Sequence, residues 1–385
     1  MKSKTCPEPV EGTRVTLDIR AFMRTHWQRA PLLVRGAFPA FRDPLTPREV
    51  LAAATRDEAP SRLVIGSGRR WSLEHGPIPA RRFKQLARRN WTVLVQDTNH
   101  FSRAAAALLA RFDFIPHARI DDVMVSYAVP GGSVGPHVDS YDVFLLQGRG
   151  RRRWQISRQR DLAFVPGLPL KILARFEPES EWVLEAGDML YLPPGVAHHG
   201  IAETECLTWS IGFRAPSDAD LVAGFLDYLG DELAPSGHYA DPGAHATRQP
   251  GAIPPRLLAH ASRTLSSIRW SRSQVRDFAG RLLTEPKAHV FFTPPRRPLG
   301  RAQFARRARS AGLTLDPKSR LAFSGTMFFM NGERAAVPAA ARAAVRRLAN
   351  RRKLAAPLKA PAAFWDAAHA WYVQGFVALG EGETP

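Results

Sequence analysis

The chain has 385 residues, more than one hydrophobic core normally holds, so two or three domains are expected. Its 45% hydrophobic residues exclude a disordered chain. The formal net charge of +19, from 54 Lys and Arg against 35 Asp and Glu, favours polyanionic surroundings such as a nucleic acid or a ribonucleoprotein. A genome that encodes Arg where Lys would otherwise stand is the alternative source of this charge.

Two cysteines, Cys6 and Cys206, exclude a disulfide framework and a metal site built from several thiolates. The first 15 residues lack the apolar core of a signal peptide. No run of about 18 uncharged apolar residues occurs, which predicts no membrane-spanning helix. We therefore expect a soluble, cytoplasmic protein.

The first half of the chain reads mainly as short strands. Helices are predicted at residues 15–27 and 102–112. Apolar runs broken by Pro and Gly predict a β-sandwich or barrel. These runs are residues 31–38, 91–97, 123–135, 143–150, 151–157, 188–195 and 206–213.

A helical pattern replaces the strands after residue 215. Apolar residues recur every three or four positions in residues 218–233 and 271–286. The connection between them, residues 234–255, is rich in Pro and Gly and is expected to be extended or mobile. This region has too apolar a face to be left in water, so we expect it to form the interface of a homodimer.

The remaining residues suggest a winged helix. A helix is predicted at residues 300–312, a hairpin turning at Ser324 and Gly325, and an Arg-rich helix at residues 340–353. The basic helix suggests contact with RNA, although winged helices also serve as protein-interaction modules. The predicted division is 1–215 for the β-rich domain, 216–285 for the helical region and 286–385 for the winged-helix-like domain.

The stretch GPHVDSYD contains the first candidate site residues. His137 and Asp139 are two apart, so in a strand they point to the same side and can bind one ion. His198 follows an apolar strand and a Pro-Pro-Gly turn in YLPPGVAHHG and is the best third ligand, with His199 as its neighbouring competitor. Two imidazoles and one carboxylate are the ligand set of non-heme iron(II) oxygenases, whereas structural zinc more often takes cysteines. The alternative is a solvated turn without a metal.

Arg152 is the second candidate. Strand alternation in GRRRWQIS places Arg152 on the same face as Trp154 and Ile156. A guanidinium on an apolar face needs an anion. A dicarboxylate cosubstrate would provide one, and the side chain of Asp142 is the alternative partner.

Taken together, these motifs resemble the Jumonji-C 2-oxoglutarate oxygenases, and among them the bacterial ribosomal oxygenases. The resemblance rests on five stretches, HWQRAPLLVRGAF, PGGSVGPHVDSYDVFLLQGRGRRRWQIS, LPPGVAHHG, SIGFRAPS and EPKAHVFFTPP. It implies an α+β chain with an N-terminal double-stranded β-helix of the cupin or jelly-roll type, a helical dimerisation region and a C-terminal winged helix.

The resemblance also implies roles for particular residues. His137, Asp139 and His198 match the iron(II) ligands, Arg152 the residue that binds the 5-carboxylate of 2-oxoglutarate, and Ser126 a second contact to that carboxylate. The implied cofactor is Fe(II), and the implied cosubstrates are 2-oxoglutarate and O2.

The activity implied by the family is hydroxylation of C3 of an arginine in a large-subunit ribosomal protein, the sixteenth, coupled to conversion of 2-oxoglutarate to succinate and CO2. Tyr141 and Asp142 are candidates for holding the substrate guanidinium. The alternatives are a Jumonji-type hydroxylase of tRNA or of another basic protein, and a non-catalytic cupin-like module that binds RNA or protein.

Overall fold

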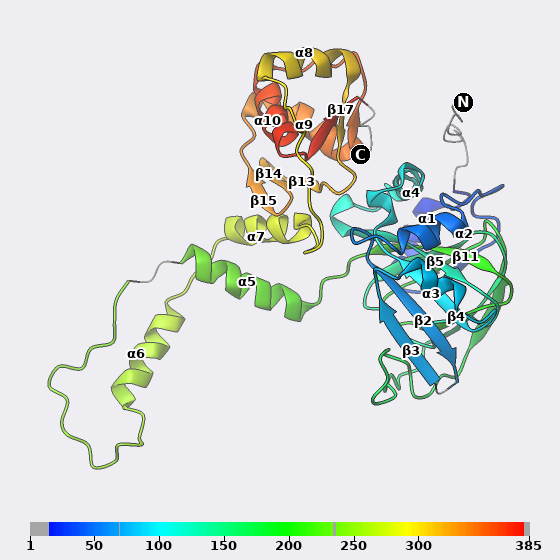
Figure 1. The fold of residues 1–385 in the computed structure, drawn as a ribbon. Coiled ribbons are helices and arrows are strands. Elements are labelled where there is room, and N and C mark those ends of the chain that lie inside the picture. Colours follow the sequence, from blue (N-terminus) through cyan, green and yellow to red (C-terminus); the bar gives the residue numbers. More distant parts are fainter. Residues whose placement is uncertain (1–14, 69, 234–235, 381–385) are drawn as a thin grey trace. The chain divides into compact units, whose positions relative to one another are not determined.

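The computed structural model describes residues 15–68, 70–233 and 236–380 (Figure 1). The N-terminal stretch that contains Cys6 lies outside them, and Cys206 is a buried free thiol. Among the described residues, no helix combines the length and apolarity that spanning a bilayer requires. The chain forms two units. The first joins the described part of 1–215 with 286–319 and the described part of 338–385, and the second joins 216–285 with 320–337. The three-domain division stays a prediction.

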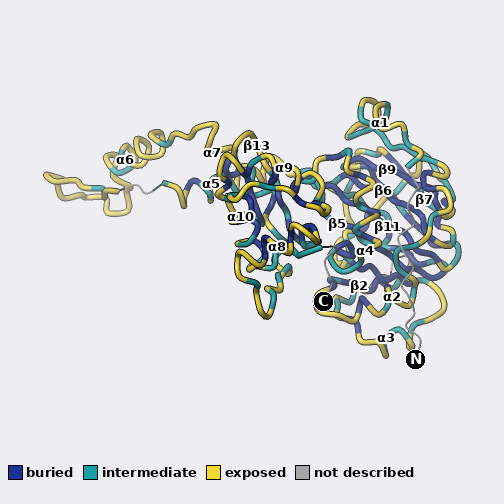
Figure 2. Tube along the Cα trace, turned by 90° about the horizontal axis from the view of Figure 1, so that it is seen from above, coloured by how far each residue is buried: buried dark blue, intermediate teal, exposed yellow. Residues whose placement is uncertain are grey.

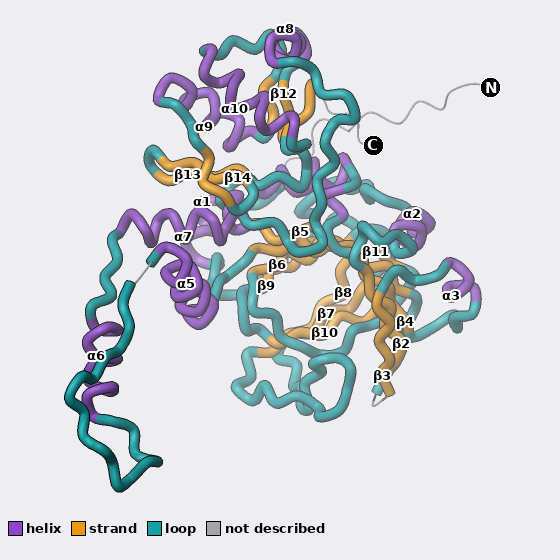
Figure 3. Tube along the Cα trace, turned by 60° about the vertical axis from the view of Figure 1, so that its left-hand side comes forward, coloured by secondary structure: helices purple, strands orange, loops and turns teal. Residues whose placement is uncertain are grey.

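The β-rich part of the first unit contains two antiparallel sheets, as the sequence predicts (Figure 3). The larger sheet has the strand order β1-β9-β6-β11-β5-β4-β2-β3, and the smaller has the order β10-β7-β8. The strands are β1 (Leu32–Val34), β2 (Ser61–Ser67), β3 (Arg70–His75), β4 (Trp91–Val95), β5 (Ile120–Ala128), β6 (Asp142–Gln147), β7 (Arg152–Ser157), β8 (Ser180–Leu184), β9 (Met189–Leu192), β10 (Ala197–Ala202) and β11 (Cys206–Phe213). The hairpin of β2 and β3 and the strand β8 were not predicted.

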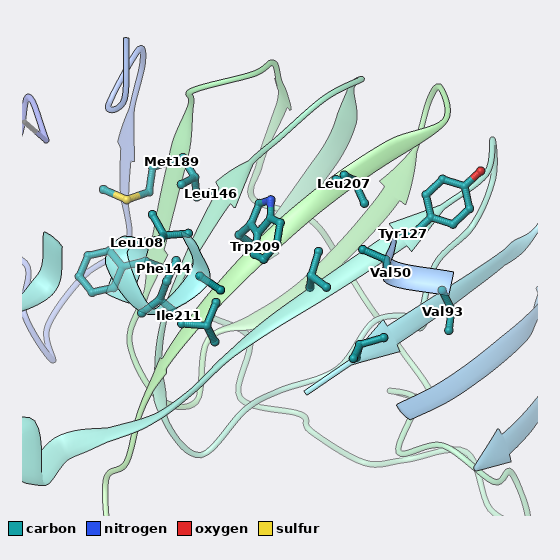
Figure 4. Close-up of a cluster of buried hydrophobic side chains, with 14 of the residues drawn as sticks. Val50, Val93, Leu108, Tyr127, Phe144, Leu146, Met189, Leu207, Trp209 and Ile211 are labelled. Carbon is teal, nitrogen blue, oxygen red and sulfur yellow. The ribbon is translucent and has the colours of Figure 1, made fainter. Parts of the chain in front are cut away.

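Strand alternation separates two sets of side chains in the larger sheet. On β11, Leu207, Trp209 and Ile211 belong to the main hydrophobic core, which Figure 4 shows together with Phe144 and Tyr127. The residues between them therefore face the other side of the sheet, toward β7 and β10. That side is apolar along β6 and β9 but polar along β5 and β11. Its apolar part is Val143, Leu145, Trp154, Ile156, Leu184, Leu190, Leu192 and Val196.

Short helices pack on the outer face of this sheet. The predicted helices at 15–27 and 102–112 are confirmed as α1 and α4, which begin where Asp18 and Ser102 cap free backbone N–H groups. The helical elements are α1 (Ile19–Thr25), α2 (Pro47–Ala53), α3 (Ala80–Lys84), η1 (Thr98–His100), α4 (Arg103–Leu109), η2 (Ala110–Phe112) and η3 (His117–Arg119). Phe22 and Leu108 anchor α1 and α4 in the main core.

The C-terminal part of the first unit is a small helical cluster with a three-stranded sheet of order β16-β12-β17. The helix predicted at 300–312 is confirmed as α8, and the Arg-rich helix as α9. The elements are α8 (Arg301–Ala311), β12 (Leu313–Leu315), η4 (Ala339–Ala341), α9 (Arg342–Arg351), β16 (Lys353–Leu354), α10 (Ala362–Val373) and β17 (Val377–Leu379). Phe304, Leu348 and Phe364 are fully buried and form the centre of this cluster.

The described residues of the second unit form three helices and one small sheet. The predicted helices are confirmed as α5 and α7, and each begins with a capping box, at Ser217 and Ser271. The hairpin at Ser324 and Gly325 is also confirmed. The elements are α5 (Asp218–Glu232), α6 (Pro255–Ser266), α7 (Arg272–Thr284), β13 (Leu321–Ser324), β14 (Met327–Met330) and β15 (Glu333–Ala335). The helix α6 was not predicted, and Figure 2 shows it without a buried residue.

Candidate metal and cosubstrate site

The backbone brings the two histidine segments together. His137 and His198 exchange both backbone hydrogen bonds, at 3.0 and 2.9 Å, and the Gly195 N–H donates to the Asp139 carbonyl at 2.9 Å. The sequence predicts a strand around His137, but the structure has only this isolated bridge, between β5 and β6. The bridge lies at the start of β10, so His198, the third predicted ligand, belongs to the smaller sheet.

The structure groups the side chains of His137, Asp139 and His198. The Asp139 Oδ2 atom lies 3.5 Å from Nε2 of His198 and 3.9 Å from Nε2 of His137. One ligand atom from each residue lies within 4.8 Å of the other two. Since metal–ligand bonds to nitrogen and oxygen are about 2.0–2.2 Å, atoms that share one ion lie no more than about 4.4 Å apart. The two distances to Asp139 meet this condition.

Backbone carbonyls orient both imidazoles. Nδ1 of His137 lies 2.9 Å from the Gly135 carbonyl, and Nδ1 of His198 lies 3.0 Å from the Val196 carbonyl. A carbonyl only accepts, so each Nδ1 carries the proton and each Nε2 keeps its lone pair for an ion. Burial, together with His137, lowers the pKa of His198 to about 4, so its imidazole is neutral, as a metal ligand must be.

The structure separates the two adjacent histidines. His198 is fully buried and belongs to the group with Asp139. His199 does not belong to it, and its ring meets Phe176 edge-on with 6.0 Å between ring centroids. On the next position of β10, Gly200 pairs with Trp154, and a Cβ there would lie 2.6 Å from the Trp154 ring. Only glycine lets β10 lie this close to the tryptophan that adjoins His198.

Arg152 lies in the interior between the two sheets, as strand alternation predicts. It is 6% exposed, and its Nη1 donates to Ser126 Oγ on β5 at 3.1 Å. Its Nε and Nη2 are buried without a hydrogen-bond partner, and no described carboxylate forms an ion pair with it. A buried guanidinium with unpaired N–H donors destabilises the fold unless an anion accepts hydrogen bonds from those donors. A carboxylate that accepts two N–H groups side by side matches the free part of the fork.

Asp142, the alternative partner of Arg152, is fully occupied elsewhere. Its carboxylate accepts from Tyr191 Oη at 2.6 Å, from Arg119 Nη2 at 2.9 Å and from Gln28 Nε2 at 2.9 Å. The carboxylate is completely buried among these donors. It therefore stabilises the fold and is not available to hold a substrate guanidinium.

A polar row on β5 leads away from Ser126. Because Val123, Val125 and Tyr127 face the main core, Asp122 and Met124 share the inner face with Ser126. Tyr141 is mostly buried, and burial together with the Asp139 carboxylate raises its pKa well above the ordinary value. Asp122 was not among the predicted site residues, although a period of two along this strand places it on the same face as Ser126.

The site residues fit the group that the sequence implies. Two imidazoles and a carboxylate offer three ligand atoms for an iron(II) ion and leave its other positions to small molecules. Arg152 and Ser126 offer three donors to a distant carboxylate, two of which have no partner among the described residues. This arrangement suits a 2-oxo dicarboxylic acid that chelates the ion at one end and pairs with arginine at the other.

Comparison with known proteins agrees with this geometry. Residues 107–221 match the family described as JmjC domain, and residues 267–378 match the ROXA-like winged helix. A solved structure of Escherichia coli YcfD, a ribosomal oxygenase in complex with cobalt and 2-oxoglutarate, superposes with a TM-score of 0.81 at 31% identity, covering 96% of this chain and all of that one. The predicted jelly roll and winged helix are confirmed.

Two curated proteins are also similar in sequence. The ribosomal protein uL16 3-hydroxylase of Escherichia coli K12 is 34% identical over 286 residues, which are 74% of this chain and 76% of that protein. The probable ribosomal oxygenase of Haemophilus influenzae is 39% identical over 210 residues, or 53% and 51% of the two chains. The fold and site define a Jumonji-C oxygenase. This chain belongs to the family of Jumonji-C ribosomal oxygenases.

Proposed function

We propose that this chain is an iron(II)- and 2-oxoglutarate-dependent oxygenase that hydroxylates C3 of an arginine in ribosomal protein uL16. The observation that carries the proposal is Arg152, a buried guanidinium with two unpaired donors in the same interior as the triad of His137, Asp139 and His198. A non-catalytic cupin-like module would have no need for such an arginine.

Each site residue has a proposed task. His137, Asp139 and His198 hold the iron(II) ion on one face, and the carbonyls of Gly135 and Val196 keep both imidazoles aimed at it. The bound ion supplies the oxygen-activating chemistry that couples decarboxylation of 2-oxoglutarate to hydroxylation.

Arg152 and Ser126 are assigned to the 5-carboxylate of 2-oxoglutarate. Arg152 pairs with it through Nε and Nη2, and Ser126 Oγ supports the guanidinium from β5 and adds its own hydroxyl. The surrounding apolar side chains of β6, β7 and β9 exclude water from the reaction.

The inner face of β5 favours a cationic substrate. Asp122 lies on that face, and Tyr141 lies against Asp139. We assign Asp122 and Tyr141 the task of binding the substrate guanidinium. A carboxylate pairs with the N–H groups of a guanidinium, and an aromatic ring stacks on its plane. The name of the similar Escherichia coli protein, a uL16 3-hydroxylase, supports uL16 and C3 as the target.

The direct test is a mass measurement. Purified protein is incubated with Fe(II), 2-oxoglutarate and O2, and with either uL16 fragments or tRNA. We expect a gain of about one oxygen atom on an arginine of uL16, one succinate per oxygen added, and no gain with Asp139→Ala. A gain on RNA alone would replace uL16 by RNA as the substrate, and the absence of any gain or succinate would favour the binding module. The same mass difference is expected in uL16 from cells with and without this gene.

We also propose that the second unit forms a homodimer interface. Several large apolar side chains of α5, α6 and the turn after α6 are exposed in the single chain, which is costly in water. They are Leu221, Val222, Leu226, Leu258, Leu265 and Trp270. We expect a dimer by light scattering and a monomer for the double variant Val222→Glu with Leu226→Glu. Phe291→Glu, at an even more exposed apolar site in the other unit, is the control.

A third proposal concerns the basic C-terminal region. Residues 286–385 contain 17 Lys and Arg against five Asp and Glu, which is most of the chain's net charge. We propose that exposed arginines of α8 and α9, such as Arg306, Arg307 and Arg347, bind the phosphates of ribosomal RNA in the cytoplasm. Changing these three to Gln should lower the slope of log affinity against log salt by roughly 0.7 to 0.9 for each phosphate that is no longer neutralised. Changing exposed Arg20 and Arg24 should leave the slope unchanged.

A further inference from the structure

Three carboxylates gather at the start of β5, and a lysine from beyond the jelly roll lies among them. Lys287 Nζ lies 3.0 Å from Asp97 Oδ1, 3.3 Å from Asp121 Oδ1 and 3.5 Å from Asp122 Oδ2. His289 Nε2 lies 2.8 Å from the other oxygen of Asp97. Lys287 and His289 follow α7 in the chain, yet they belong to the same unit as β5.

The contacts leave the two oxygens of Asp122 in different surroundings. Oδ2 accepts from the Asp97 backbone N–H at 3.1 Å and also faces Lys287. Oδ1 lies beside Gly212 of β11, where an added Cβ would be 3.7 Å away. Gly212 has no side chain, so the chain itself leaves this side of Oδ1 uncovered by a β11 side chain. The carboxylate is thus fixed through Oδ2, the oxygen that faces the Asp97 N–H and Lys287.

Lys287 also keeps the cluster charged. Burial raises the pKa of Asp122 to about 6, and the Lys287 ammonium acts in the opposite direction. Burial alone would lower the pKa of Lys287, but Asp122, Asp121 and Asp97 outweigh it and raise that pKa. Without the lysine, three carboxylates, two of them buried, would lie close together, and at least one would tend to take up a proton. A protonated Asp122 would bind a guanidinium poorly.

We infer that Lys287 is a positioning residue of the substrate site, which holds Asp122 so that its Oδ1 receives the guanidinium of the substrate arginine. This inference rests on the proposed function. It assigns the segment after α7 a part in substrate selection, since the lysine reaches the inner face of β5 from outside the jelly roll. Asp121 pairs with both Lys287 and Arg214, whose Nε lies 3.2 Å from Asp121 Oδ1. Asp121 therefore helps to hold Lys287 in place beside Asp122.

The test compares a uL16 peptide containing arginine with the same peptide containing citrulline, its uncharged analogue. In wild-type protein we expect a strong preference for arginine. Lys287→Met removes the charge at nearly equal length, and should raise KM for the arginine peptide roughly tenfold while changing kcat less than about twofold. The preference for arginine over citrulline should fall by about the same factor. The Lys287→Arg variant keeps the positive charge and should therefore keep most of the wild-type preference for arginine.

Controls separate this role from a structural one. Lys318→Met changes another lysine of the same region, one that binds the Phe291 carbonyl, and should leave the arginine preference intact. If Lys287→Met does not fold, Lys287→Gln is compared at matched thermal stability.

An unchanged preference in a folded Lys287 variant would overturn the inference and leave the proposed function standing. An equal loss in Lys318→Met would overturn it as well. A wild-type protein that binds both peptides equally would overturn both.

Discussion

Arg152 and Asp142 are both charged side chains buried in the jelly roll, and their surroundings differ. Asp142 receives three hydrogen bonds from side chains of the same chain, one of them from Arg119. Arg152 has one hydrogen-bond partner, Ser126, and two donors that have none among the described residues. A buried charge whose partners are complete stabilises the fold, whereas one whose partners are missing marks the place of a ligand. The comparison makes different predictions for the two residues.

The largest effect is expected at the metal triad. His198→Ala removes a ligand, so metal binding and succinate release should fall by more than about 100-fold, since even the partners of metal ligands change affinity by about 10- to 100-fold. Metal content and turnover are measured together. The matched control is His199→Ala, which should change both less than about threefold because His199 packs on Phe176. A large loss in His199→Ala together with a small loss in His198→Ala would contradict the assignment of His198 as the metal ligand.

Removing Asp142 should damage stability. Asp142→Ala leaves Arg119 and Tyr191 without their shared acceptor, and should lower the free energy of unfolding by about 3 kcal/mol, at the low end for a broken buried ion pair because Arg119 is partly exposed. Denaturant unfolding measures this loss. A decrease in the free energy of unfolding of less than about 1 kcal/mol would contradict the role of Asp142 in stabilising the fold.

Arg152→Met should have the opposite profile. The free energy of unfolding should stay equal or rise, since an incompletely paired charge is replaced by an apolar side chain of similar length. The KM for 2-oxoglutarate should rise about 100-fold, because two charge-assisted hydrogen bonds are removed. The control is Arg153→Met on the opposite face of β7, where Arg153 pairs with Glu181 and Glu203. A stability loss like that of Asp142→Ala, with unchanged KM, would contradict the comparison.

The smallest effect is expected at Ser126. Ser126→Ala removes one hydrogen bond from the Arg152 guanidinium, which keeps its other donors, and should raise the KM for 2-oxoglutarate about fivefold, which corresponds to about 1 kcal/mol. In the double variant with Arg152→Met the serine should matter less, because it acts largely through the arginine. Fully additive effects would show that Ser126 and Arg152 contribute independently.

Strand periodicity explains why much of the fold and site could be predicted from sequence. Residues of alternate position lie on one face, so Arg152 was placed inward from local sequence alone, whereas Ser126 was implied by the family resemblance. The exception is the segment of His137, which was predicted as strand and forms a single bridge. The pairing of His137 with His198 depends on contacts between residues far apart in the chain, and the choice of His198 over His199 came from its position after the Pro-Pro-Gly turn.

Two other features were not predicted. The helix α6 has Leu258 and Leu265 among the apolar residues of one face, so its sequence carries a helical signal, which the long Pro- and Gly-rich connection before it obscured. Lys287 reaches Asp97, Asp121 and Asp122 only because the chain returns to the jelly roll after α7. Nothing in the sequence near Lys287 indicates three carboxylates as its partners. Such contacts follow from tertiary structure.

The central claim is that the triad and Arg152 bind opposite ends of one iron–2-oxoglutarate complex. A crystal structure from crystals grown without oxygen in the presence of Fe(II) and 2-oxoglutarate would test this claim. The account predicts an ion about 2.0–2.2 Å from Nε2 of His137, from Oδ2 of Asp139 and from Nε2 of His198, with the far carboxylate of the cosubstrate on Arg152. An ion bound elsewhere, or a carboxylate that leaves the Arg152 Nε and Nη2 unpaired, would contradict it.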